Sequence, residues 1–292
     1  MSKVSTYIRE SFARGDNIRD AGLTTPEDVV RFDNIAYGPD PRQQSLDVYR
    51  PRASQGQILP VIVSVHGGGW VYGDKERYQF YCMSLAQRGF AVVNFTYRLA
   101  PENKFPASLE DTNSVFGWVL ANGENYGFDT RHIFAVGDSA GAQLLGLYAS
   151  ICTNPAYASF YDFQPPIGFR PTAIALNCGA SRLVEDKSDQ TVALMEELLP
   201  EKGTDRELWL LDVTAHISGN YPPTFFMTST GDFLRKQAGP LAAALVEANV
   251  PLVYRYYGDQ DHLLPHVFHC DVRSEEGKLC NDEECAFFRE FL

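Results

Sequence analysis

From residue 59 onward, short apolar stretches alternate with longer segments of helical spacing, and this alternation constrains the fold more than any other feature. Residues 60–65 are rich in β-branched side chains, as expected of a strand buried on both faces. Further strands are predicted at 91–97, 133–136, 173–176, 224–228 and 252–256, with helices at 76–88, 108–120, 140–151, 234–248 and 282–291. Such alternation predicts an α/β fold with a mostly parallel central sheet and helices on both faces.

The part of the chain before residue 59 follows a different pattern. Two strand-like stretches, 31–37 and 45–49, are separated by a proline-rich segment that begins at Gly38, and this arrangement predicts an antiparallel pair. Residues 25–28, Thr-Pro-Glu-Asp, predict the start of a helix with proline at its first position.

Three segments lack the regular alternation of strand and helix: 1–30, 153–171 and 181–221. Ligand sites of open α/β sheets lie at the carboxyl ends of the strands. We therefore expect a single domain of residues 1–292, in which these three segments form a small cap over that edge.

The sequence Gly-Asp-Ser-Ala-Gly at 137–141 joins a predicted strand to a predicted helix. A serine between two glycines at such a junction is typical of a nucleophile elbow, in which the serine adopts a strained backbone conformation. A glycine turn capped by a serine is the structural alternative. The setting makes Ser139 a candidate nucleophile.

A second motif, His-Gly-Gly-Gly-Trp at 66–70, directly follows the predicted strand at 60–65. Acyl transfer requires hydrogen-bond donors for the oxygen that becomes negative in the tetrahedral intermediate, and glycines leave backbone N–H groups unobstructed. A phosphate-binding loop is disfavoured, because neither Gly-Lys-Ser/Thr nor GxGxxG is present. His66 is expected to anchor this loop.

In this order, the two motifs resemble those of the hormone-sensitive-lipase-like branch of the α/β-hydrolase family. The resemblance extends from about residue 40 to the end of the chain and includes LDVYRP at 46–51, YRLAPE at 97–102 and FPASLED at 105–111. It implies the α/β-hydrolase fold with a small cap. It also implies a serine esterase that requires no cofactor and no metal.

The resemblance implies roles for individual residues. Ser139 would be the nucleophile, and the backbone amides of Gly68, Gly69 and Ala140 would form the oxyanion hole. The acid would be Asp232, because Gly-Asp-Phe-Leu-Arg at 231–235 resembles the aspartate-leucine-arginine stretch of the family with one residue inserted. The carboxylate of Asp232 could also cap the helix that follows.

The histidine of the triad is chosen among three candidates. The family usually has His-Gly-Phe a few residues after the last strand, whereas this chain has a longer lead-in with His262, His266 and His269. His266 is favoured because His-Val-Phe at 266–268 matches the His-x-Phe pattern. His262 and His269 remain alternatives, since geometry and not position defines a triad.

Charge and composition restrict the partners. Lys and Arg number 25 against 37 Asp and Glu, for a net charge of −12, which argues against nucleic acids and anionic membranes. We find no signal peptide and no apolar run long enough for a membrane span. The six cysteines lack CxxC and zinc-site spacing, so we expect a reduced, soluble, cytoplasmic protein. An edge strand or terminal helix could support a homodimer.

The sequence thus predicts a carboxylesterase that hydrolyses small, short-acyl esters through Ser139, His266 and Asp232. Removal of acetyl groups from carbohydrates and formamidase activity are enzymatic alternatives. A ligand-binding receptor with an α/β-hydrolase fold is the non-enzymatic alternative, and it is disfavoured because all three residue types of the triad are available.

Overall fold

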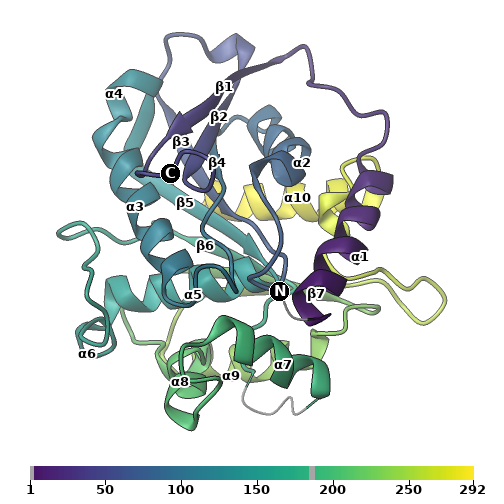
Figure 1. The fold of residues 1–292 in the computed structure, drawn as a ribbon. Helices are drawn as coiled ribbons and strands as arrows, with labels where there is room; N and C mark the ends of the chain where they lie inside the picture. Colours follow the sequence, from purple (N-terminus) through teal and green to yellow (C-terminus); the bar gives the residue numbers. More distant parts are fainter. Residues whose placement is uncertain (1–2, 184–187) are drawn as a thin grey trace.

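The computed structural model describes residues 3–183 and 188–292 of the chain. Within these residues, eight strands form one sheet in the order β1-β2-β4-β3-β5-β6-β7-β8 (Figure 1). The pairs β1–β2 and β2–β4 are antiparallel, and every other neighbouring pair is parallel. The strands are β1 Val29–Ala36, β2 Ser45–Pro51, β3 Leu59–Val65, β4 Ala91–Phe95, β5 Phe128–Asp138, β6 Ile174–Asn177, β7 Thr224–Ser229 and β8 Leu252–Tyr257. The predicted α/β-hydrolase architecture is confirmed.

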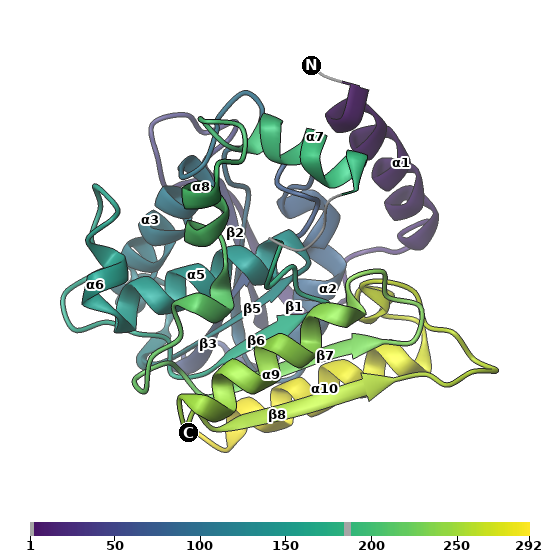
Figure 2. The same ribbon diagram turned by 90° about the horizontal axis from the view of Figure 1, so that it is seen from below.

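Helices cover both faces of the sheet, as the apolar character of its central strand requires. In β3, Val61 and Val63 pack into one hydrophobic cluster and Ile62 packs into another, and all three side chains are fully buried. The first cluster lies under α3 Ala107–Ala121, α5 Ala140–Thr153 and α9 Ala238–Glu247. The second lies under α2 Lys75–Gln87 and α10 Glu275–Arg289 (Figure 2). A strand with apolar side chains on both faces needs such double cover.

The N-terminal segment differs from its sequence prediction. Residues 25–28 do not begin a helix: the N–H of Val29 donates to the carbonyl of Pro26, and β1 starts at once by pairing Val29 with Pro51. The carbonyls of Glu27 and Asp28 accept hydrogen bonds from Arg52, so strand pairing prevails over the proline signal. The helix of this segment lies earlier, as α1 Lys3–Arg19.

The last two predicted helices also have different limits. The C-terminal helix begins at Glu275, capped by the side chain of Ser274, seven residues before the predicted start at 282. The predicted helix at 234–248 is divided into a short 3₁₀ turn, η3 Arg235–Gln237, and α9. The remaining elements are short: η1 Arg52–Ser54, α4 Gly123–Tyr126, α6 Pro155–Ala158, α8 Asp205–Leu210, η2 Val213–Ala215 and η4 Phe268–Cys270.

The three segments expected to form the cap lie in two places. Helix α1 packs against α7 Asp189–Leu198, and both lie over the edge of the sheet (Figure 2). Residues 153–171, in contrast, carry α6, which packs against the far end of α5, where Tyr157 stacks on His216. Four residues of the third segment, 184–187, lie outside the described residues.

Two further expectations concern the chain as a whole. No helix in the described part of the chain is both long enough and apolar enough to cross a membrane. The six cysteines are free thiols, and all but Cys152 are buried.

Candidate active site

Ser139 lies at the sharp turn between β5 and α5. Its backbone has φ 51° and ψ −118°, a strained conformation for a residue with a side chain. Its N–H donates to the carbonyl of Asn177 at 2.9 Å, and its own carbonyl accepts from Ala180 at 3.1 Å. These bonds to the end of β6 hold the turn, so the strain is balanced by the neighbouring strand.

The two glycines of this turn are required by close backbone contacts. A Cβ atom on Gly141 would lie 2.1 Å from the carbonyl oxygen of Val65, and one on Gly137 would lie 2.6 Å from the carbonyl oxygen of Gly141. Real Cβ atoms do not approach backbone oxygens this closely. The sequence spacing of glycine around Ser139 is thus explained by the packing of α5 against β3 and β5.

The glycine-rich loop at 66–70 lies beside the serine turn. Gly68 has φ 118° and Gly69 has φ 60°, and a Cβ on Gly68 would lie 2.1 Å from the carbonyl oxygen of Tyr72. Ala140 is the first residue of α5, where helix N–H groups have no acceptor within the helix. The three predicted oxyanion donors therefore lie in two adjacent backbone turns. One turn is built from glycines with positive φ, and the other contains the strained residue Ser139.

His66 anchors this loop. Its ring is fully buried, stacks on Tyr97 with centroids 3.9 Å apart, and has its Nδ1 2.7 Å from the carbonyl oxygen of Gly67. Burial lowers the pKa of His66 to about 4, so the ring is neutral at pH 7. It does not line the pocket that contains Ser139.

A buried carboxyl connects the two motifs. The hydroxyl of Tyr78 donates to Oδ2 of Asp138 at 2.7 Å and accepts from the N–H of Gly67 at 2.9 Å. Asp138 is only 3% exposed, and burial raises the pKa of its carboxyl to about 6. This chain of hydrogen bonds holds the glycine-rich loop against the residue that precedes Ser139.

Asp232 and His266 form a hydrogen-bonded pair. Nδ1 of His266 lies 2.6 Å from Oδ1 of Asp232, which also accepts from the N–H of Leu234 at 2.8 Å. The other carboxylate oxygen accepts from the hydroxyl of Thr228 at 2.6 Å. Burial alone would raise the pKa of Asp232, but the hydrogen bond and charge of His266 outweigh burial and lower it. One carboxylate thus both contacts the histidine and caps the following turn.

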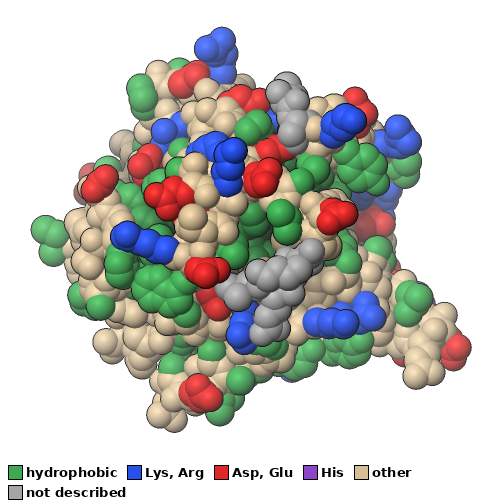
Figure 3. All heavy atoms as spheres, turned by 60° about the horizontal axis from the view of Figure 1, so that its bottom comes forward, with side chains coloured by type: hydrophobic (Ala, Val, Ile, Leu, Met, Phe, Trp, Pro, Cys, Tyr) green, Lys and Arg blue, Asp and Glu red, His purple; other side chains and the backbone are tan. Residues whose placement is uncertain are grey.

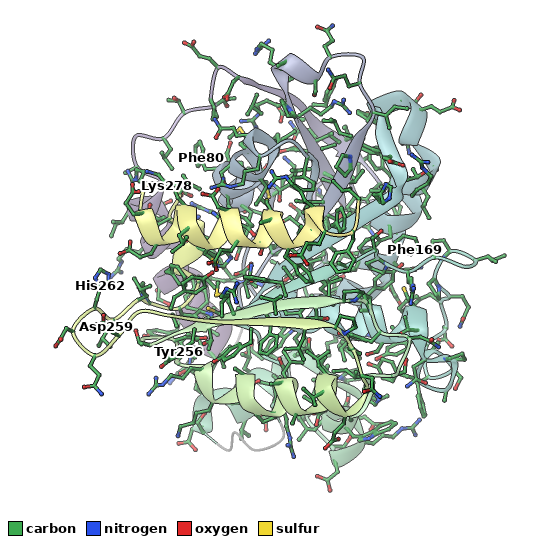
Figure 4. The ribbon with its side chains drawn as sticks, turned by 180° about the vertical axis from the view of Figure 1, so that it is seen from behind. Phe80, Phe169, Tyr256, Asp259, His262 and Lys278 are labelled. Atoms are coloured by element: carbon green, nitrogen blue, oxygen red, sulfur yellow. The ribbon has the colours of Figure 1, made fainter. Side chains whose placement is uncertain are left out.

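The other two candidate histidines lie elsewhere. The side chain of His262 is 59% exposed and lies on a loop that projects from the molecule beyond β8, together with Asp259 (Figure 4). His262 contacts Glu276 at 3.3 Å. His269 is fully buried beside Tyr81, and burial lowers its pKa to about 3. Of the three, the structure brings His266 to Asp232.

Ser139 and His266 line one pocket of about 480 Å³. Its floor includes Gly68, and one wall is contributed by α1. The aromatic side chains of the lining are Phe12, Tyr72, Tyr78, Phe233 and Phe268, and the charged ones are Asp16, Arg19, Asp138 and Asp271. No residue of 153–171 lines this pocket. Contrary to the expectation, that segment does not cover the site.

One residue of this pocket, and the helix that forms one of its walls, were not predicted from the sequence. Phe233, the residue inserted next to Asp232, packs its ring on His266 with centroids 4.2 Å apart. The wall from α1 belongs to segment 1–30, which was expected to form part of the cap, but no helix was predicted at 3–19. Its signal is the spacing of Val4, Ile8 and Phe12, four residues apart, which marks one face of a helix.

A possible metal site overlaps this pair. In the described part of the chain, Cys178, Asp232 and His266 are the group whose ligand atoms could hold an ion, since these atoms lie within 4.8 Å of one another. The Asp232 and His266 atoms are 2.6 Å apart, whereas two ligands of a tetrahedral zinc ion are separated by roughly 3.4 Å. The arrangement fits a hydrogen-bonded pair with a thiol beside it.

Comparison with known proteins supplies independent information. The sequence model of the alpha/beta hydrolase fold family matches residues 62–266. Carboxylesterase NlhH of Mycobacterium tuberculosis is 31% identical over 242 residues, which cover 78% of this chain and 71% of that protein. Versiconal hemiacetal acetate esterase of Dothistroma septosporum is 28% identical over 239 residues, with 75% and 71% covered.

The structural similarity extends over the full length. Esterase B of Lactobacillus rhamnosis, in a crystal structure described with a tributyrin phosphonate, superposes with a TM-score of 0.88 and 27% identity. The match covers 100% of this chain and 96% of that one. The similarity therefore includes the N-terminal helix and the C-terminal helix as well as the region matched by the family.

Proposed function

The chain belongs to the alpha/beta hydrolase family and is a carboxylic ester hydrolase, and from this premise we propose that it is a serine carboxylesterase for small, short-acyl esters. The observation that carries the proposal is that Ser139 and His266, whose Nδ1 is hydrogen-bonded to Asp232, line the same pocket. Because these relatives are esterases, they do not favour the alternative of a ligand-binding receptor.

In the proposed reaction, the hydroxyl oxygen of Ser139 attacks the ester carbonyl carbon while Nε2 of His266 takes the hydroxyl proton. The hydrogen bond from Nδ1 to Asp232 fixes the orientation of the ring and stabilises its charged form. The protonated imidazole then gives the proton to the leaving alcohol. Water, deprotonated by the same nitrogen, cleaves the acyl-enzyme and restores the serine.

The negative oxygen of each tetrahedral intermediate would accept hydrogen bonds from the backbone of Gly68, Gly69 and Ala140. Each such donor typically contributes roughly 3 kcal/mol to transition-state stabilisation. The hydrogen bonds through Tyr78 support this role, because they hold the glycine-rich loop in place before substrate binds.

Two observations support short acyl groups. The pocket of about 480 Å³ is shared by the acyl group, the alcohol group and the reacting atoms. The relatives named above include an acetate esterase and an esterase described with a tributyrin phosphonate. Neither observation favours a long-chain lipid.

Deacetylation of carbohydrates is a second candidate, supported by the polar wall of the pocket. Asp16, Arg19 and Ser11 all line it from α1. Carboxylate, guanidinium and hydroxyl groups at such positions can bind the hydroxyl groups of a sugar, which an acyl pocket of purely apolar residues would not.

The expected partners follow from the net charge of −12, which does not favour nucleic acids or anionic membranes. On the face over α7 and α8, Lys and Arg are interspersed with Asp and Glu and with hydrophobic side chains (Figure 3). A small neutral ester is consistent with such a surface.

The test is hydrolysis of p-nitrophenyl acetate, butyrate and octanoate and of an acetylated xylo-oligosaccharide, with Ser139→Ala as the matched variant. We expect turnover that depends on Ser139 and falls beyond butyrate, with the melting temperature of Ser139→Ala close to wild type. Preference for the oligosaccharide would instead favour deacetylation. Turnover that persists in Ser139→Ala would overturn the assignment of the nucleophile.

A further inference from the structure

A buried cysteine outside the predicted triad lies against it. Cys178 directly follows β6, is 1% exposed and has φ 47°, a conformation that side chains rarely adopt. Its N–H donates to the carbonyl of Met227 at 2.8 Å, which holds the residue in this conformation.

The thiol of Cys178 contacts both halves of the pair. It lies beside the carboxylate of Asp232 and the backbone N–H of Val267, the residue after His266. Its sulfur lies within 4.8 Å of the Asp232 and His266 atoms that face it. Val267 itself has φ 52°, which is unusual for a β-branched residue. Strained positions on two separate segments thus lie next to one sulfur atom.

The protonation state of the sulfur determines its role. Burial, together with the charge of Asp232, raises the pKa of the Cys178 thiol well above its ordinary value. The group is therefore a neutral S–H that can donate one hydrogen bond. The thiol lies 3.8 Å from Sδ of Met227, to which it can donate, and the carboxylate of Asp232 is the second acceptor within 4.8 Å. A carboxylate is the stronger acceptor of the two, which favours rotation of the S–H toward Asp232.

This donor completes the set around the carboxylate. Asp232 already accepts from His266, Leu234 and Thr228, and a carboxylate has about four acceptor positions. A fourth donor leaves the carboxylate little freedom to rotate. Rotation would move Oδ1 away from Nδ1 of His266 and misalign the imidazole.

We propose that Cys178 is a positioning residue of the esterase, which fixes the Asp232 carboxylate and the His266 loop relative to each other through its thiol. The proposal rests on the function proposed above. Cys178 does not touch the substrate and takes no part in the nucleophilic chemistry. Its loss should therefore lower kcat and leave KM unchanged.

The test compares Cys178→Ala, which removes the donor, with Cys178→Ser, which keeps one. Cys285→Ala is the matched control, because Cys285 is also a fully buried thiol but belongs to α10. kcat and KM are measured on p-nitrophenyl acetate or butyrate, whichever wild type hydrolyses faster, and melting temperatures are recorded. The loss of a hydrogen bond to a charged group typically lowers a rate by about tenfold or more. Because a thiol is a weak donor, we expect the smallest of these effects, about tenfold.

We expect kcat of Cys178→Ala to fall about tenfold while KM stays within about twofold, and Cys178→Ser to keep kcat within about twofold. Cys285→Ala should keep wild-type kcat even if its melting temperature falls. Wild-type kcat in Cys178→Ala, or a loss in Cys178→Ser as large as in Cys178→Ala, would overturn the proposal. If Cys178→Ala does not fold, a tenfold loss of kcat in Cys178→Ser overturns it equally.

These outcomes separate the inference from the function on which it rests. Wild-type hydrolysis that depends on Ser139, combined with unaffected Cys178 variants, overturns the positioning role alone. Wild-type hydrolysis that does not depend on Ser139 overturns both.

Discussion

At the scale of single residues, backbone strain is concentrated around the pocket. Ser139, Cys178 and Val267 have φ between 47° and 52°, and Gly68 has φ 118°. Residues in such conformations persist only where surrounding contacts hold them, here the hydrogen bonds to Asn177 and Met227. The site therefore depends on neighbouring strands for its geometry, and small changes in those strands should alter activity more than stability.

The choice between histidines is tested at the same scale. We expect His266→Ala to lose roughly a thousandfold or more in kcat, because the general base is removed. His262→Ala should keep kcat within about twofold, since its side chain is 59% exposed and contacts Glu276. Steady-state kinetics of both variants decide the matter, and the reverse result would assign the base to His262.

At the scale of elements, Arg9 attaches α1 to the residue that follows the glycine-rich loop. Nε of Arg9 donates to the carbonyl of Val71 at 2.7 Å, and Nη2 donates to the carbonyl of Ala100 at 3.0 Å. The same guanidinium forms an ion pair with Glu102 at 2.7 Å. These contacts place the wall that carries Asp16 and Arg19 beside the pocket.

Arg9→Ala should therefore weaken both the fold and substrate binding. Hydrogen bonds from a charged donor contribute about 1.5–3 kcal/mol each, so we expect a clear drop in melting temperature. We also expect KM to rise, because α1 is held less firmly. Arg14→Ala is the control, since Arg14 is exposed on the same helix. Equal melting temperatures and KM values for the two variants would contradict the attachment.

At the scale of the whole molecule, a buried acid connects α10 to the sheet and to α2. Glu284 is fully buried and accepts from the hydroxyl of Tyr81 at 3.1 Å and from Nδ2 of Asn177 at 2.6 Å. Burial raises the pKa of Glu284 from 4.5 to about 7. Asn177 also binds Ser139 through its carbonyl, so this acid supports the rear of the site.

The raised pKa gives a pH dependence with a definite sign. The contribution of Glu284 to stability is complete below pH 4.5 and is lost as the pH rises toward about 7, because the unfolded chain releases this proton more readily. Glu284→Gln cannot ionise and should gain stability relative to wild type over that range, by roughly 3 kcal/mol at most. Denaturant unfolding of both proteins at pH 5, 6, 7 and 8 measures the difference. A difference that does not vary with pH would contradict the raised pKa.

Much of the fold could be predicted from local sequence. Apart from β5, which begins five residues early at Phe128, the strands of the sheet from residue 59 onward lie within two residues of their predicted limits, because each is a short apolar run. The turn at Ser139 and the glycine-rich loop are also local, since the glycines that allow them stand beside the residues they serve. Their predicted catalytic roles await the kinetic tests.

The features that local sequence did not predict depended on contacts between distant parts of the chain. Residues 25–28 form a turn because Arg52 binds their carbonyls, and residues 153–171 lie away from the pocket because α6 packs against α5. The sequence left three histidines as candidates for the partner of Asp232, because the loop before His266 is longer than in the family pattern.

The sequence by itself therefore determined the alternation of strands and helices from residue 59 onward, and it identified the nucleophile turn and the glycine-rich loop as candidates. The tertiary structure decided that His266 meets Asp232, that Cys178 lies against both, and that α1 forms a wall of the pocket. The physical reason is the range of the interactions. Backbone propensity and glycine conformation act within a few residues, whereas these contacts join segments more than thirty residues apart that only the packed sheet brings together.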